Sequence, residues 1–96
     1  MASKYIISIS EFCNNYGVDE VFVMHFTEAK LIHLKKEGEK QFIQEDELPK
    51  LEKMVRLYHD LGINLEGLET IAHLLDRVDE MNKELQSLKN RLRLYE

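Results

Sequence analysis

The sequence predicts a mainly α-helical protein in which a winged helix-turn-helix head carries a long carboxyl-terminal coiled-coil helix. Three observations predict this fold. Two short helical segments are joined through a glycine, two apolar runs enclose a charged turn, and the last third of the chain repeats apolar residues every seven positions. We assign residues 1–63 to the head and residues 64–96 to the long helix with its dimerisation seam.

The helix-turn-helix is predicted from local capping signals. Ser10 is the expected N-cap of a helix over residues 11–16, because its hydroxyl can accept a free backbone N–H. Gly17 ends this helix, since glycine readily adopts the left-handed conformation after a helix. Asp19 then caps a second helix over residues 20–28. Two short helices around a glycine turn define a helix-turn-helix.

Strands are expected at three places. Apolar residues alternate over residues 5–9, which predicts a short extended lead-in. Apolar runs at 31–34 and 41–44 flank a charged, glycine-containing turn at 35–40, which predicts a hairpin. A hairpin directly after a helix-turn-helix is called a wing.

A third helix follows the wing. Acidic residues 45–47 crowd its start, where free N–H groups favour negative charge, and Pro49 is tolerated only in the first turn. The expected buried stripe consists of Leu48, Leu51, Met54, Val55, Leu57, Tyr58 and Leu61. Gly62 should end this helix and Asn64 should cap the next one.

The last helix, from about residue 65 to 95, carries a heptad pattern. The two apolar series are Ile71, Val78, Leu85 and Leu92, and Leu74, Met81, Leu88 and Tyr95. Such a helix would be roughly 46 Å long, too long for the head to cover, so the seam predicts a homodimer. A parallel pair would match Glu84 with Lys89, whereas an antiparallel pair could set Arg77 against Glu84. Both orientations fit the sequence.

No chemical site is apparent in the sequence, and we expect no enzyme, no cofactor and no metal ion. The histidines, His25, His33, His59 and His73, lack the i, i+3 or i, i+4 spacing of helical metal sites. Cys13 beside Phe12 is expected to be a small buried hydrophobe, and a single cysteine cannot form an internal disulfide. No apolar run approaches the ~20 residues that span a bilayer. The first residues also lack the apolar segment of a signal peptide, so we expect a cytoplasmic protein without a membrane partner.

The second helix is poorly suited to DNA. The chain has a formal net charge of −5, and residues 19–29 contain no lysine or arginine, whereas Asp19, Glu20 and Glu28 are acidic. Because phosphate neutralisation supplies much of the affinity for DNA, an acidic helix would be repelled by the backbone it must approach.

The same helix has more apolar residues than a core face needs. Val18, Val23 and Phe26 suffice for the core, which leaves Val21 and Met24 on the opposite side with His25. An exposed apolar patch with an acidic rim is typical of a protein-binding surface. The alternative is burial of Val21, Phe22 and Met24 against the wing or the long helix. The predicted partner-contact residues are Asp19, Glu20, Val21, Met24, His25 and Glu28.

The order of these elements and several short motifs resemble the MerR superfamily. The residues that carry the likeness are 9–13 (ISEFC), 16–18 (YGV), Phe42, 47–48 (EL) and 57–63 (LYHDLGI). Residues 11–13 (EFC), 55–61 (VRLYHDL) and 67–68 (GL) are similar, in particular, to the CbpM family of chaperone modulators.

The resemblance to CbpM implies a non-catalytic protein that binds the J-domain of a CbpA-like co-chaperone and inhibits its stimulation of Hsp70. J-domains present a basic helix, which an acidic surface would complement. The resemblance to MerR regulators implies the alternative, a DNA-binding transcriptional regulator. Phosphate contacts would then fall to Lys35, Lys36 and Lys40 of the wing and to Arg56.

Overall fold

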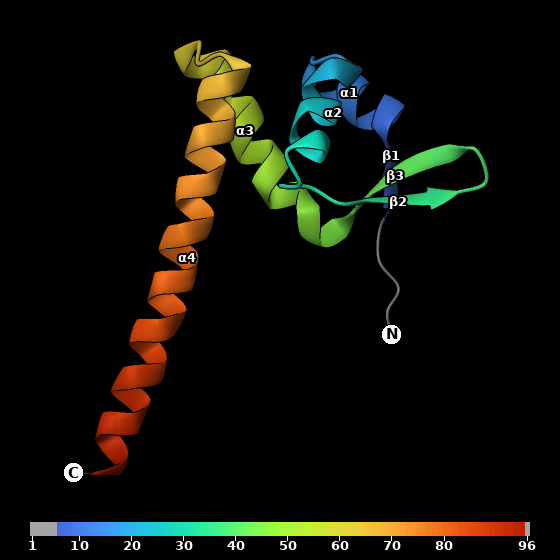
Figure 1. Ribbon diagram of the computed structural model, residues 1–96. Helices are drawn as coiled ribbons and strands as arrows, with labels where there is room; N and C mark the ends of the chain where they lie inside the picture. The colour runs from blue at the N-terminus through green and yellow to red at the C-terminus, as the bar shows by residue number, and fades with distance from the viewer. Residues whose placement is uncertain (1–5, 96) are drawn as a thin grey trace.

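The computed structural model describes residues 6–95 and has the predicted architecture of a helical head, a small sheet and a long helix (Figure 1). The elements are β1 (Ile6–Ser8), α1 (Ile9–Tyr16), α2 (Glu20–Glu28), β2 (Leu34–Glu37), β3 (Lys40–Gln44), the 3-10 helix η1 (Glu45–Glu47), α3 (Leu48–Leu61) and α4 (Leu65–Leu94). The principal dimensions are 53 × 36 × 20 Å. The elongation comes from α4, which extends as a rod away from the head (Figure 1).

The first helix begins earlier than the sequence indicated. Ser8, not Ser10, is the N-cap of α1: its hydroxyl accepts the Glu11 N–H at 3.1 Å, and the Glu11 carboxylate accepts the Ser8 N–H at 3.3 Å. This reciprocal arrangement satisfies two free backbone N–H groups. It requires the serine and the glutamate to be three residues apart, and Ser10 is adjacent to Glu11, so Ser10 cannot form it. Ile9 therefore belongs to the helix and is buried in the core instead of continuing the strand.

The turn into α2 and the bounds of α2 are as predicted. Gly17 adopts φ 70° and its N–H donates to the Cys13 carbonyl oxygen at 2.9 Å. The Asp19 carboxylate accepts the Phe22 N–H at 3.3 Å, which caps α2. These interactions lie within four residues along the chain, so the sequence contains the whole signal.

The sheet differs from the predicted hairpin in two ways. Its strand order is β1-β3-β2, so the lead-in strand pairs antiparallel with the wing through Ile7 and Ile43. The first wing strand is Leu34–Glu37, so it begins three residues later than predicted and includes residues 35–37, which were expected in the turn. Leu31 and Ile32 are instead buried, with both N–H groups donating to the Phe26 carbonyl oxygen. The burial of these two apolar side chains in the core outweighs their preference for a β-strand.

The third helix also starts later and buries less than expected. Residues Glu45–Glu47 form η1, and α3 begins at Leu48. Leu51, Met54 and Val55 are buried and Leu57 is half-buried, but Tyr58 is 39% exposed and Leu61 is 67% exposed. The predicted stripe was therefore wrong at the carboxyl-terminal end of α3, where Tyr58 packs edge to face against Phe22 but stays partly exposed and Leu61 is mostly exposed.

The core joins the head to the start of α4. It consists of Ile9, Phe12, Cys13, Phe22, Val23, Phe26, Leu31, Ile32, Ile43, Leu51, Met54, Val55, Leu68 and Ala72. Lys50 strengthens this junction, since its Nζ donates to the Leu31 carbonyl oxygen at 2.9 Å and lies 3.2 Å from an Asp76 carboxylate oxygen. The first turns of α4 are thus fixed relative to α2 and α3.

The long helix begins where the sequence predicted. The Asn64 side chain accepts the Gly67 N–H at 2.8 Å, and the helix ends at Leu94 with Tyr95 as its C-cap. Only Leu68 and Ala72 of α4 are buried within the described chain. No helix in residues 6–95 combines the length and apolar character that a bilayer-crossing segment needs.

Candidate partner-binding surface

The outward face of α2 is acidic at both ends and apolar at Val21. Glu20 and Glu28 are exposed, and Val21 is 63% exposed. Phe22 is only 3% exposed, so the possibility that it is buried is confirmed for this side chain. Asp19 is exposed as well, although its carboxylate also serves as the N-cap. The exposed part of α2 therefore offers three carboxylates around one aliphatic side chain.

Met24 and His25 occupy a different position from Val21. Both are half-buried, and Met24 packs against the core. His25 Nε2 lies 2.9 Å from Glu69 Oε1 on α4, at an angle that makes no hydrogen bond among the described residues. His73 Nε2 lies 3.8 Å from the other oxygen of Glu69. His25 is thus part of the contact between α2 and α4 more than of the outward face.

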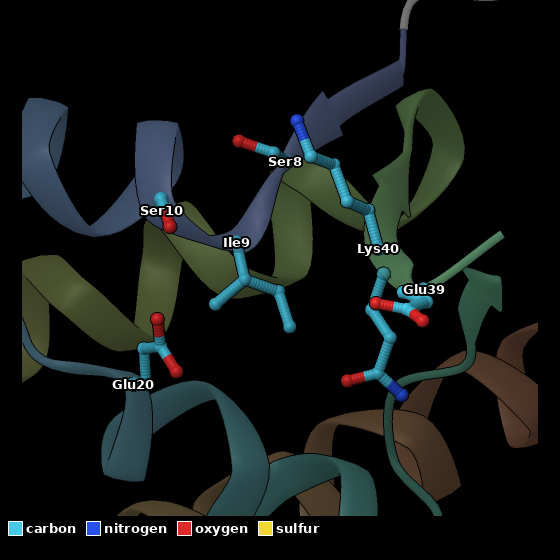
Figure 2. A pocket seen from close by; sticks show the side chains of 7 residues that line it. Ser8, Ile9, Ser10, Glu20, Glu39 and Lys40 are labelled. Atoms are coloured by element: carbon cyan, nitrogen blue, oxygen red, sulfur yellow. The ribbon is translucent and has the colours of Figure 1, made fainter. Parts of the chain in front are cut away.

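A hollow of about 330 Å³ separates the amino-terminal turn of α2 from the wing, and we call it the wing hollow. It is lined by Ser8, Ile9, Ser10, Glu20, Glu39, Lys40 and Gln41. Figure 2 shows Glu20 on the α2 side of this space and Glu39 on the wing side, with Ile9 between them. Two carboxylates and one ammonium group leave the wing hollow mildly negative.

A second hollow, of about 430 Å³, is lined by the same turn; polar and apolar atoms contribute about equally to its wall, and we call it the apolar hollow for the Val21, Phe22 and Tyr58 side chains that line it. It is lined by Gly17, Val18, Asp19, Val21, Phe22, Tyr58 and Leu65. The Phe22 and Tyr58 rings meet edge to face with their centroids 5.3 Å apart. Such aromatic pairs are stable and specific in geometry, so this part of the hollow has a defined shape.

The apolar hollow was not predicted from the sequence, because the helical spacing placed Tyr58 in the buried stripe of α3. The partial exposure of Tyr58 beside Phe22 and Leu65, and the exposure of Leu61 three residues later, follow from tertiary packing and not from the helical spacing of α3. Glu39 of the wing was likewise missed, since only tertiary structure brings the wing turn beside α2.

No lysine or arginine side chain belongs to α2 itself, although Lys40 of the wing lines the wing hollow together with Glu20. Lys35, Lys36 and Lys40 are exposed on the wing, and Arg56 is exposed on α3. Lys35 Nζ lies 4.0 Å from a Glu37 carboxylate oxygen, so part of its charge is offset locally. The wing carries the cations that a phosphate contact would require, whereas the helix that would enter a groove carries none.

Within residues 6–95, no three histidine, cysteine or acidic side chains come together as a potential metal site. Cys13 is buried as predicted; burial raises the pKa of its thiol, and the charges of Glu20 and Asp19 raise it further. The carboxylates at the start of α2 therefore act on a thiol that is buried in the core of the head.

The heptad seam is exposed along most of α4. Ile71 is half-buried against the core of its own chain. The other predicted seam residues are 51–87% exposed, and they are Leu74, Val78, Met81, Leu85, Leu88, Leu92 and Tyr95. Figure 1 shows this part of α4 extending beyond the head. An apolar stripe of this length on one face of a helix is typical of a surface that another helix covers.

The fold and this surface define a winged helix-turn-helix protein with a helical extension. The chain matches the model of a family described as MerR HTH family regulatory protein, over residues 7–90. It therefore belongs to the MerR helix-turn-helix family of regulatory proteins. No curated protein matches its sequence.

Proposed function

We propose that this chain is a chaperone modulator that binds the J-domain of a CbpA-like co-chaperone and inhibits its stimulation of Hsp70. The observation that carries the proposal is the outward face of α2, which presents Glu20, Val21 and Glu28 and no basic side chain. A phosphate backbone would be repelled by this face. The basic helix of a J-domain would be attracted to it, which favours both encounter and correct orientation.

The mechanism we propose is occlusion. The acidic and apolar surface of α2 covers the basic helix of the J-domain, so that this helix no longer reaches Hsp70. No covalent bond forms or breaks, and inhibition depends only on the occupancy of the J-domain. The proposed contact residues remain Asp19, Glu20, Val21, Met24, His25 and Glu28, with Met24 and His25 at the edge because they are half-buried.

We further propose that the protein acts as a homodimer joined through α4. Apolar side chains exposed at heptad spacing over Leu74 to Tyr95 support this proposal, because water is a poor environment for such a stripe. A dimer would present two copies of the α2 surface.

The test is a calorimetric titration of a purified J-domain into the protein, with a variant that combines Glu20→Lys and Glu28→Lys. We expect the variant to bind about tenfold more weakly, since each exposed ion pair contributes about 0.2–1 kcal/mol and reversal adds repulsion. The dependence of affinity on salt should also become shallower. A control that combines Glu37→Lys and Glu45→Lys changes the net charge equally on exposed sites away from α2. Equal affinity of wild type and the α2 variant would remove this helix from the interface.

A second candidate function is sequence-specific DNA binding, which the family match and the exposed wing lysines favour. A gel-shift assay at moderate salt separates the two functions, because a regulator should hold a defined site at nanomolar concentration. Lys35, Lys36, Lys40 and Arg56 by themselves predict only weak, salt-sensitive and nonspecific retardation.

A further inference from the structure

At the apolar hollow, the exposed Val21 side chain of α2 lies beside apolar side chains of two other elements. Val21 reaches it from α2, Tyr58 from α3 and Leu65 from the start of α4. Val21 and Tyr58 are 63% and 39% exposed. Phe22, only 3% exposed, contributes a buried aromatic side chain. A side chain placed here would lose contact with water on several sides at once, which is how anchor residues bind.

Acidic side chains beside the apolar hollow favour a basic occupant. Asp19 lines it, and Glu20 follows directly and lines the wing hollow together with Glu39. The amino-terminal turn of α2 is therefore an acidic ridge between two hollows. A cationic side chain next to an apolar one would find a partner for each group.

We propose that the apolar hollow seats an aliphatic or aromatic side chain from a basic segment of the partner protein, with a neighbouring lysine or arginine against Asp19 and Glu20. This inference rests on the proposed function and makes it more specific. The partner crosses the amino-terminal end of α2 and touches α3, instead of lying along the full length of α2. Tyr58 thereby becomes a contact residue, and Glu28 moves to the rim.

The test compares Val21→Ser and Val21→Arg with wild type in a calorimetric titration of the J-domain. Val21 is mostly exposed, so both variants should keep the folded state, which circular dichroism checks. We expect Val21→Ser to weaken binding about tenfold, as loss of an anchor contact does. Val21→Arg should weaken it further, because a cation would then face a cationic segment. Leu94→Ser is the matched control, because Leu94 is 82% exposed at the far end of α4 and outside the heptad seam.

The outcomes are distinguishable. If wild type binds the J-domain and both Val21 variants bind equally well, the apolar hollow is not the anchor site, although the proposed function stands. If wild type itself fails to bind the J-domain, the proposed function fails and this inference fails with it. If Val21→Ser instead changes the sedimentation behaviour of the protein alone, the occupant is a second copy of the chain, and the assignment to a partner protein is wrong.

Discussion

The contribution of two neighbouring seam residues, Leu85 and Leu88, to the stability of the proposed dimer can be estimated. Leu85 and Leu88 are 51% and 58% exposed in the single chain. Full burial of a leucine side chain contributes about 1.5–3 kcal/mol, so covering the exposed half of each contributes about 1 kcal/mol. A dimer contains four such side chains, which together stabilise it by about 4 kcal/mol. Combining Leu85→Lys with Leu88→Lys should therefore raise the dimer dissociation constant at least about a thousandfold.

Sedimentation equilibrium over a range of protein concentrations measures this effect. We expect the wild type to be dimeric at micromolar concentration and the double variant to be monomeric. Leu94→Lys adds a lysine to the same helix at a position that is outside the seam, and it should leave the dimer intact. A double variant that remains dimeric would refute the assignment of the seam, whatever the function of the head.

Three further predictions concern the first turn of α4 and the head. Gly67→Ala should lower the free energy of unfolding, measured in urea, by about 1 kcal/mol. The new Cβ would lie 2.9 Å from Ile63 Cγ2 and would crowd the Asn64 side chain that caps α4. Helix propensity alone predicts that alanine stabilises the helix, so a gain in stability would contradict this reasoning. The Tyr16 hydroxyl donates to Glu52, and this hydrogen bond, with burial second, raises the pKa of Tyr16 above its ordinary value of 10.0. The folded state therefore holds the Tyr16 proton more tightly than the unfolded state does, so the stabilisation from the protonated hydroxyl is complete below pH 10 and is lost as the pH rises further. Tyr16→Phe should make the decrease in stability at alkaline pH less steep. An unchanged dependence of stability on pH would count against the hydrogen bond. Burial raises the pKa of the Cys13 thiol, so at pH 8 a thiol reagent should label it much more slowly in the folded protein than in urea; equal rates would show that the α1 core is open.

Local capping signals in the sequence predicted the bounds of α2, the ends of α1 and α3 and the start of α4, but not the starts of α1, β2 and α3. The bounds of α2 follow from Gly17 and Asp19, and the start of α4 follows from Asn64, because each cap acts within four residues. Where two capping residues competed, at Ser8 and Ser10, the reciprocal hydrogen bond with Glu11 decided the outcome. A single preferred residue type does not contain that information, whereas the pair of residues three apart does.

The candidate surface was predictable in charge but not in shape. The lack of lysine and arginine in residues 19–29 can be read directly from the chain. The half-burial of Met24 against the core is a tertiary property, and the contact between His25 and Glu69 depends on α4, some forty residues later in the chain. The pairing of the lead-in strand with the wing also joins segments far apart in sequence.

The sequence by itself determined the helices, their caps, the acidic character of α2 and the heptad repeat, because propensity, capping and periodicity are local properties. Only the tertiary structure decided which apolar side chains stay exposed. Tyr58 and Leu61 have the same spacing as the buried residues of α3, yet Tyr58 is only partly covered, by Phe22 and the other residues around the apolar hollow, and Leu61 is mostly exposed. Burial is set by where other segments pack, and that is a property of the whole chain.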